Sequence, residues 1–540
     1  MAHFRLASAL RLLGVLPALV FLASACSSEK IVFRDPRTAK TPADTAGGYL
    51  GYFDVANKQT TCGGCHVAHQ RDWKGTPHAG AYKTLTDLGS EAQPFCFNCH
   101  TVNGRGNKSD STAKVGWNQV QDSSYHDVQC ESCHGPGFQH VQSPDTPGNV
   151  PLAHVSMDDS SASCAACHSG THHPFVNEWK QSGHSGIIAE AAGRTECQSC
   201  HNGLGTLKSW GVNTAFAEQG RTTPMAVTCA VCHNPHGSPN ESQLRFSISS
   251  PDPEQNLCMR CHLRRAEPAG GAYGLGPHAP QGAVLLGTAG YRARNFAYDT
   301  ARIFTSHASE RNPRLCAGCH VQNYEVTDSL TGTFQFRATG HLFKADPCVD
   351  PATRKPLADN SCAYTTDVRS FRACANSGCH ASEQAAASAL VNERDRINTL
   401  ANQIWADNNA NDKVDAGDTG YLAQIMTSTP TAFQADTVIS PAEGALFNIR
   451  LVVEKRYANG DRSLGVHNPF LAEALLRANV TELQQVYGLG APSAAVQRIL
   501  ESPLPEQSLQ RPPRRILPGL QTSLHGAPAR AAGARDVSLR

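Results

Sequence analysis

The sequence is poor in the side chains that build a large apolar core. Of its 540 residues only 7% are aromatic, and it holds five Trp and five Met. Gly and Pro are plentiful instead, at 45 and 32 residues, which favours loops and turns. Because a chain of this length must bury an interior, the composition indicates that groups other than apolar side chains fill part of it.

Net charge is also low. Lys and Arg number 47 and Asp and Glu number 46, which gives a formal net charge of +1. A chain so evenly balanced has no basic field of the kind that attracts nucleic acid or an acidic membrane surface. No nucleic-acid partner is therefore predicted, and membrane contact is predicted only through the N-terminus.

Long apolar runs are absent except at the N-terminus. Arg5 and Arg11 give this region a positively charged start, and residues 12–25 are mostly apolar. The small residues 23–25 end the apolar run. This pattern predicts an export signal over residues 1–25, too short to favour a spanning helix. Cys26 follows directly, and the stretch resembles a bacterial lipobox. We therefore predict a lipid anchor on Cys26 and a polar tether over 26–55, in the periplasm or at the outer membrane or cell surface; ordinary cleavage beside an unmodified Cys26 is the alternative.

Cysteine and histidine are the abundant residues, at 21 and 24. The pattern Cys-x-x-Cys-His occurs eight times, where a shuffled chain of this composition would hold about 0.04 copies. The pattern is typical of haem c attachment, because two thiols add to the vinyl groups of one porphyrin edge and the adjacent His binds the iron. The eight motifs are Cys62-Cys65-His66, Cys96-Cys99-His100, Cys130-Cys133-His134, Cys164-Cys167-His168, Cys197-Cys200-His201, Cys229-Cys232-His233, Cys258-Cys261-His262 and Cys316-Cys319-His320.

Zinc sites and disulfides are the alternatives for paired cysteines. Zinc sites also use Cys-x-x-Cys pairs. They do not require a His after every second Cys, and all eight copies here have one. A zinc or disulfide scaffold without haem is therefore disfavoured.

A ninth candidate site has a wider gap between its cysteines. The stretch RACANSGCHA, residues 372–381, contains Cys374, Cys379 and His380. Taken alone it fits a haem site of stretched spacing, a knot of four thiols with the upstream cysteines, or two disulfides. The first cysteines of the last three sites fall at 258, 316 and 374, two equal steps, and this regularity favours a ninth haem.

The first six motifs form an internal repeat. CHVAHQRDWKGTPHAG, residues 65–80, aligns with CHSGTHHPFVNEWKQSGHSG, residues 167–186, and CESCHGPG aligns with CAVCHNPHG. This predicts a duplicated trihaem module. The predicted domains are trihaem modules over 56–150, 151–245 and 246–385, a helical segment over 386–484 that supplies a distal His, and a disordered tail over 485–540.

Histidines outside the motifs supply the second axial ligand of each iron. His3 in the signal and His525 in the tail are set aside. An iron held by two His is coordinatively saturated, which suits electron transfer better than substrate binding. The predicted distal ligands are His78, His126, His140, His184, His236, His278, His307, His341 and His467, with His69, His154, His172 and His173 as spares.

Several stretches resemble known multihaem cytochromes c. CGGCHVAHQRDWKGTPHAGA resembles the tetrahaem cytochromes of nitrifying bacteria, and CESCHGPGFQH and CHNPHG resemble doubled-CxxCH modules. The C-terminal half is similar to larger multihaem proteins of anaerobic and extracellular respiration, in the ordered pieces LCMRCH, PHAPQGAVLLGTAGY, SHASERNPRLCAGCH, GHLFKADPC, CANSGCH and SLGVHNPFLAEALL. The resemblance covers about residues 60–475. It implies a mostly α-helical and irregular fold with little sheet and stacked haems as its core, with distal ligands at His278, His307, His341 and His467.

One departure concerns the last site, which these families usually write as CxxCH. A longer loop between Cys374 and Cys379 can bulge and still present both sulfurs. Cys348 and Cys362 then belong to no haem motif, and they are predicted to form a disulfide in an oxidising compartment. A four-thiol metal knot is disfavoured on this interpretation.

A second metal site is suggested by DNNANDKVDAGD, residues 407–418. The stretch partly fits an EF-hand-like loop, but position 6 is Asp412 rather than Gly and position 12 is Asp rather than Glu. A polar turn between helices is the alternative, whereas the Asp-rich loops of the related cytochromes favour calcium. The candidate ligands are Asp407, Asn409, Asn411, Asp415 and Asp418.

The leading hypothesis is electron transfer along about nine covalently bound bis-His haems c, in anaerobic or extracellular respiration. Predicted partners are other cytochromes, an outer-membrane porin conduit or an extracellular acceptor such as a metal oxide. The alternative is a multihaem reductase or oxidase of small nitrogen or sulfur compounds, which would need one open haem. No CxxCK motif occurs and His is ample, so no catalytic residue is predicted.

Overall fold

The computed structural model describes most of the chain after residue 40. The predicted signal peptide over 1–25, Cys26 and the tether up to residue 40 lie outside the described residues, as does the predicted tail from residue 503. The described residues are 41–89, 92–107, 114–158, 163–269, 276–304, 306–328, 330–376, 379–434, 436–453 and 459–502.

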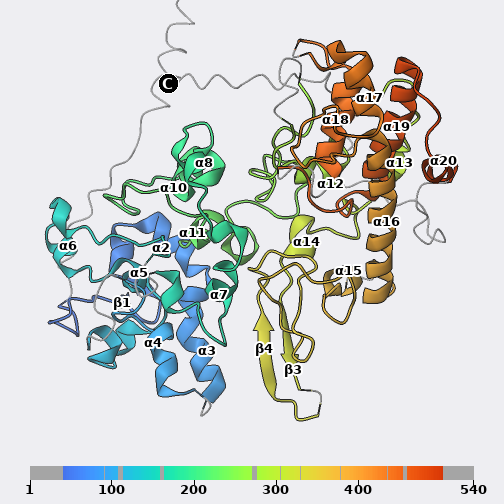
Figure 1. The fold of residues 1–540 in the computed structure, drawn as a ribbon. Coiled ribbons are helices and arrows are strands. Elements are labelled where there is room, and N and C mark those ends of the chain that lie inside the picture. Colours follow the sequence, from blue (N-terminus) through green and yellow to red (C-terminus); the bar gives the residue numbers. More distant parts are fainter. Residues whose placement is uncertain are drawn as a thin grey trace, which may run out of the picture.

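The N-terminal part, residues 41–269, is built from short helices joined by loops (Figure 1). Its longest helices have only eight residues. The helices are α2 (Val67–Lys74), α3 (Ala81–Leu88), α4 (Phe97–His100), α5 (Cys130–His134), α6 (Phe138–Gln142), α7 (Phe175–Trp179), α8 (Ala189–Gly193), α9 (Gln198–His201), α10 (Gly203–Ser209) and α11 (Cys229–Cys232).

The predicted repeat is visible as matching local structure in this part. A 3-10 turn opens each first motif, at Cys62–Gly64 and at Cys164–Ala166, and α2 and α7 follow in equivalent places. Trp73 on α2 donates its indole N–H to the carbonyl of Val128 at 2.9 Å. Trp179 on α7 makes the same bond to Val227, also at 2.9 Å. Each tryptophan thus ties the start of a repeat to the chain just before that repeat's third motif.

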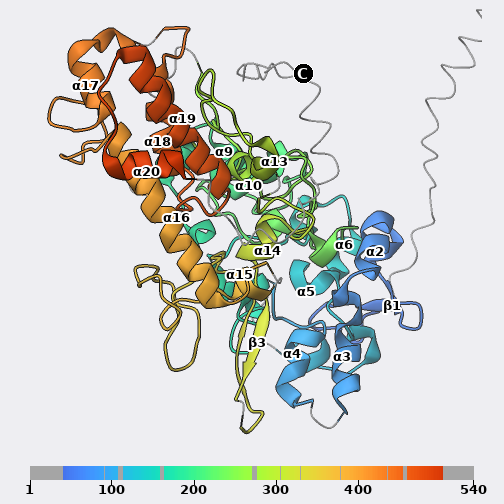
Figure 2. The same ribbon diagram turned by 90° about the vertical axis from the view of Figure 1, so that its right-hand side faces the viewer.

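Two small antiparallel sheets are the strand structure of the described residues. β1 (Tyr52–Asp54) pairs with β2 (Gln59–Thr60), and β3 (Tyr324–Thr327) pairs with β4 (Phe334–Ala338). In the second sheet Tyr324 faces Ala338 and Val326 faces Phe336. Both views show this hairpin extending away from the C-terminal helices (Figures 1 and 2). The prediction of a mostly helical and irregular fold with little sheet is confirmed.

The C-terminal part forms a bundle of longer helices. Four helices lead into it: α12 (Gln281–Leu286), α13 (Thr300–Phe304), α14 (Cys316–His320) and α15 (Arg372–Asn376). The bundle consists of α16 (Glu383–Ile404), α17 (Tyr421–Ser428), α18 (Pro441–Val452), α19 (Pro469–Tyr487) and α20 (Ala494–Glu501), with α16, α17 and α18 packed against α19 (Figure 2).

Local sequence signals explain where the long helices begin. The Ser382 side chain accepts a hydrogen bond from Ala385 N–H at the start of α16. Ser440 and Glu443 form a capping box at α18, with Pro441 in the first turn. Asn468 caps α19, which ends at Gly488 in the left-handed conformation (φ 62°). These are standard helix start and stop signals.

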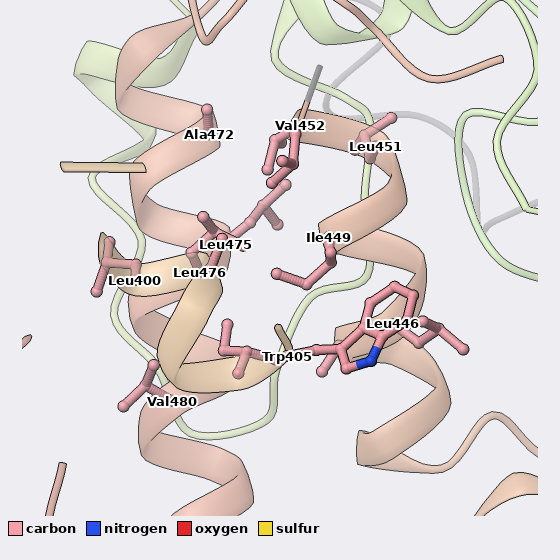
Figure 3. Close-up of a cluster of buried hydrophobic side chains, with 14 of the residues drawn as sticks. Leu400, Trp405, Leu446, Ile449, Leu451, Val452, Ala472, Leu475, Leu476 and Val480 are labelled. Atoms are coloured by element: carbon pink, nitrogen blue, oxygen red, sulfur yellow. The ribbon is translucent and has the colours of Figure 1, made fainter. Parts of the chain in front are cut away.

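The bundle has a large apolar core of its own. A single cluster contains 31 buried residues, drawn mainly from α16–α20. Trp405, Leu475 and Leu400 are fully buried within it, and Figure 3 shows them between the helices. In the N-terminal part the largest cluster contains four buried residues, Tyr49, Val102, Trp117 and Tyr125. Apolar packing is therefore concentrated in the bundle.

The predicted start of the disordered tail at 485 is wrong by at least one helix. Residues 494–501 form α20, whose Val496 and Ile499 are buried at 1% and 9% exposure. These two residues stand three apart and pack on the bundle, with α20 lying against α16. Pro, Arg, Ala and Gly dominate residues 485–540, so the composition did not indicate the short amphipathic face of α20. Among the described residues, no helix has the length and apolar content needed to cross a bilayer.

Candidate haem-binding sites

The motif residues meet around one cavity of about 3590 Å³. All nine motif histidines line it, as do the motif cysteines with the exception of Cys96. The lining extends from Phe53 in the N-terminal part to Glu393 on α16 and Pro469 at the start of α19 in the bundle. Sites that are spread over more than 300 residues of sequence thus open into one continuous space.

Each motif folds into a single tight turn. In five motifs the N–H of the His donates a hydrogen bond to the carbonyl of the first Cys, at 2.8–3.0 Å. This bond closes the turn. The two cysteines and the His of each of these motifs line the cavity, as haem attachment requires. The five histidines are His66, His168, His201, His233 and His262.

The ninth site keeps this bond despite its longer gap. His380 N–H donates to the Cys374 carbonyl at 3.2 Å, across two additional residues. Cys374, Cys379 and His380 all line the cavity with the other motifs. The first Cys and the His of the ninth site are therefore joined by the same backbone hydrogen bond as in the regular motifs.

Eight motif histidines have a second imidazole facing them across the cavity. An iron bound to two imidazole nitrogens at about 2 Å each separates the two ring centres by about 6 Å. The observed separations are 6.0–6.4 Å. The pairs are His66 with His140, His134 with His236, His168 with His78, His201 with His278, His233 with His341, His262 with His184, His320 with His467 and His380 with His307.

The predicted distal ligand His126 does not lie in this space. Its ring stacks on Tyr82 with centroids 3.5 Å apart and packs against Trp117, and it is absent from the cavity lining. His173 lines the cavity, and burial followed by the charge of His100 lowers its pKa. His173 is therefore a cavity histidine whose pKa responds to His100, and its ring centre lies 6.0 Å from that of His168. His126 is close to a motif in sequence, but its packing against Tyr82 and Trp117 keeps its ring out of the cavity.

His69 is a further imidazole near the first site. Its ring centre lies 6.3 Å from that of His66, close to the 6.4 Å of His140, and it stacks on His236 at 4.4 Å. Two rings therefore lie within ligand distance of His66. His154, another spare, instead pairs with Glu218 at 3.5 Å.

The imidazole pairs cross the predicted module boundary at residue 150. His78 from the first repeat faces His168 of the second, and His236 from the second faces His134 of the first. Thiols of different motifs are also neighbours: the pKa of Cys62 responds to Cys130, and that of Cys164 to Cys229 at the matching place of the second repeat. The two repeats are interleaved rather than side by side.

Electrostatics keep these imidazoles in the form that binds iron. Burial is the main cause that lowers the pKa of five of them to about 4, so they are neutral at pH 7. These are His168, His184, His236, His320 and His341. In several rings Nδ1 is hydrogen-bonded to a backbone carbonyl, as in His100, whose Nδ1 lies 2.6 Å from the Ala81 carbonyl oxygen. This leaves Nε2 for the iron. Thiol pairs, neutral imidazoles and their spacing together fit haem c.

Two of the cysteines outside the motifs form a separate feature. Cys348 and Cys362 are joined by a disulfide with an S–S distance of 2.05 Å. The four-thiol arrangement does not form: among the described residues no cluster of three or more His, Cys, Asp or Glu is arranged to hold a metal ion by itself.

The Asp-rich loop between α16 and α17 is closed by its own hydrogen bonds. Asp418 accepts from the Trp405 indole at 2.8 Å and from Asn408 N–H at 3.1 Å. Asp415 accepts from the side chains of Asn409 and Asn411, which lower its pKa. The loop thus has the structure of a compact polar turn, and calcium binding by it stays a prediction.

Two family descriptions match parts of the chain. "Cytochrome c554 and c-prime" matches residues 61–135, which hold the first three motifs. "Doubled CXXCH motif" matches residues 223–267, which hold the sixth and seventh.

Curated relatives are multihaem proteins. Multiheme cytochrome MtrA of Shewanella baltica is 27% identical over 226 residues, 38% of this chain and 59% of that protein. C-type polyheme cytochrome OmcB of Geobacter sulfurreducens is 27% identical over 316 residues, 53% of this chain and 38% of that protein. The chain therefore spans less than two thirds of the length of either relative.

Among solved structures, an undecaheme cytochrome from the S-layer of Carboxydothermus ferrireducens is similar. The match has a TM-score of 0.37 and 20% identity, and covers 67% of this chain and 50% of that one. The repeated attachment motif, its regular turn and the named relatives agree with one another, and they support a multihaem c-type cytochrome.

Proposed function

We propose that the protein carries nine covalently bound haems c with two axial His each and passes electrons along them in extracellular respiration. The observation that carries this proposal is the set of eight imidazole pairs at 6.0–6.4 Å around one cavity. For the second site the proposal takes His173 as the partner of His100, because both line the cavity and the charge of His100 lowers the pKa of His173. A saturated iron has no place for a substrate but exchanges electrons readily, so the arrangement suits a carrier.

The neighbouring thiols support a continuous path. Thiols whose pKa values respond to each other relate the first site to the third, the fourth to the sixth and the seventh to the eighth. Cys133 responds in the same way to Cys164, and Cys232 to Cys258, which links these three pairs of sites. Porphyrins attached at adjacent thiols must lie close together, which short-range electron transfer requires. The chain itself would supply burial, axial imidazoles and hydrogen bonds that set each potential.

The partners and location are inferred from the relatives and the N-terminal sequence. We propose export, a lipid on Cys26 and an electron acceptor or donor that is another cytochrome, a porin-associated conduit or an extracellular oxide. Mass spectrometry of the mature protein tests this part: the N-terminal peptide should carry a diacylglyceryl group on Cys26. An unmodified N-terminus would reject the lipid and leave the haem proposal standing.

The haem proposal is tested by counting haems and examining their spin state. Pyridine haemochrome assay and intact mass should give nine haems per chain, and electron paramagnetic resonance of the oxidised protein should give low-spin signals alone. Fewer haems would overturn the count of nine. A high-spin ferric signal would favour the alternative function, reduction of a small nitrogen or sulfur compound. The second site is where an open iron would lie, because His100 is the motif His without a facing ring in the pairs given above.

A further inference from the structure

His467 differs from the other facing imidazoles in what its Nδ1 contacts. It donates to the Asp461 carboxylate, with Nδ1 and Oδ1 2.6 Å apart. The Asp461 side chain is 2% exposed, so this is a buried carboxylate. Six other axial candidates use a backbone carbonyl instead: His100, His134, His233, His307, His320 and His341. His140 and His278 have no hydrogen-bond partner at Nδ1 among the described residues.

The Asp461 carboxylate is held in position by the loop that joins α18 to α19. The backbone N–H of Asp461 donates to the Leu451 carbonyl at the end of α18, at 2.8 Å. Ser463 donates its hydroxyl to the second carboxylate oxygen and accepts from His467 N–H at 3.1 Å. The ring and the carboxylate are therefore oriented by the same short segment, before any haem is considered.

A carboxylate at this position changes the iron that His467 would bind. Accepting the Nδ1 proton draws the imidazole toward imidazolate, a stronger electron donor that stabilises Fe(III) over Fe(II). The negative charge acts in the same direction, and burial leaves little water to screen it. A backbone carbonyl is a weaker acceptor and carries no net charge. The effect on the reduction potential is therefore larger at His467 than at the other imidazoles.

We propose that Asp461 is a positioning residue that makes the eighth haem, held by Cys316, Cys319, His320 and His467, the haem of lowest potential in the chain. The proposal rests on the proposed function, because it requires iron between His320 and His467, whose ring centres are 6.0 Å apart. The eighth site lies between the seventh, through the Cys258–Cys316 contact, and the ninth, whose Cys379 acts on Cys319. A low-potential haem here is an energetic step for electrons that pass between the seventh and the ninth haem.

Asp461→Asn tests the proposal, because Asn keeps the size and an acceptor oxygen but removes the charge. The expected result in a spectroelectrochemical titration is that the most negative of nine components moves to a more positive potential while the other components stay in place. The low-spin resonance of that haem should shift with it. Ser463→Ala is the matched control: it removes a hydrogen bond to the same carboxylate but keeps the charge, so it should leave the lowest component lowest.

The outcomes separate this inference from the proposed function. Nine low-spin haems in Asp461→Asn with an unchanged titration curve would overturn the role of Asp461 and leave the electron carrier intact. Fewer than nine haems in the wild-type protein would instead overturn the proposed function. If Asp461→Asn loses the eighth haem, Asp461→Glu is measured instead, because it keeps the charge. Nine bound haems with the most negative component at its wild-type potential would support the inference. Nine bound haems without that component would refute it.

Discussion

Residues 41–269 and residues 383–502 bury their interiors with different material. The bundle encloses most of a 31-residue apolar cluster between helices of up to 22 residues. The N-terminal part has helices of at most eight residues and apolar clusters of three or four, arranged around the cavity that holds the motif cysteines and histidines. The N-terminal part therefore keeps its interior for haem, whereas the bundle has a protein core and presents one face to the cavity.

The largest expected effect follows from producing the chain without haem attachment, for example in a cytoplasm where thioether bonds are not formed. The bundle should keep its helices because its core needs no haem, whereas residues 41–269 should lose their fold because too little apolar surface remains buried. Hydrogen exchange measured by mass spectrometry checks this. We expect slow exchange in α16, α18 and α19 and fast exchange throughout 41–269.

The haem-loaded protein is the control for this experiment, since both regions should be protected in it. Protection of α2 or α7 equal to that of α19 in the haem-free chain would contradict the comparison. It would show that the short tryptophan-anchored turns fold by themselves.

A core substitution in the bundle should give the next largest effect. Leu475 is fully buried on α19. Leu475→Ala should lower the free energy of unfolding of the bundle by about 2–5 kcal/mol, through lost burial and the cavity left behind. Far-UV circular dichroism during denaturation should show this shift, while the low-spin haem spectrum before unfolding stays unchanged.

Val486→Ala on the same helix is the matched control. Val486 is 57% exposed, so its truncation should change the free energy of unfolding by no more than about 0.5 kcal/mol. An altered haem spectrum in Leu475→Ala would indicate that the two regions share one core.

Two histidines distinguish haem ligation from ordinary aromatic packing within the N-terminal part. His173→Ala should convert one haem of nine to a high-spin or ligand-exchanged state, because it removes the imidazole that lies with His100 on the cavity. His126→Ala should weaken the packing of Tyr82 and Trp117 but leave the spin state of every haem unchanged. Electron paramagnetic resonance of the two variants checks this. A high-spin signal in His126→Ala alone would restore the assignment made from sequence.

The proximal half of each haem site could be predicted from sequence, and the distal half could be predicted only in part. Covalent chemistry fixes two cysteines and one His within five residues, or seven at the ninth site, so the motif is local. The distal imidazoles come from remote segments, as His467 does for His320, and sequence supplies candidates for them rather than pairs. His126 and His173 show the limit, since burial beside Tyr82 is a tertiary property.

The bundle shows a similar limit. Its long helices could be expected from apolar spacing and from start signals such as Ser440 and Pro441. α20 was missed because only Val496 and Ile499 mark its buried face within a stretch of tail-like composition. Two apolar residues are too few to predict a buried helix face unless the surface of α16 against which they pack is known.

The smallest expected effect concerns Glu393, where the bundle meets the haem cavity. Its carboxylate is buried with no hydrogen-bond partner among the described residues, and burial, then the nearby Glu473, raise its pKa from 4.5 to about 8. Arg396 and Arg477 lower this pKa, but both are engaged by Glu473. Between pH 4.5 and 8 the unfolded chain releases this proton and the folded chain keeps it. The free energy of unfolding therefore falls as pH rises through this window.

Glu393→Gln removes the titrating group and should remove that loss. The variant should match the wild type near pH 4.5 and exceed its free energy of unfolding by on the order of 2 kcal/mol at pH 8, a dependence measured by denaturation at several pH values. Glu501→Gln at the exposed end of α20 should show no such trend. Parallel stability curves for wild type and Glu393→Gln would mean that Glu393 is ionised in the folded protein. The boundary between the apolar core and the haem core would then be wetter than the bundle behind it.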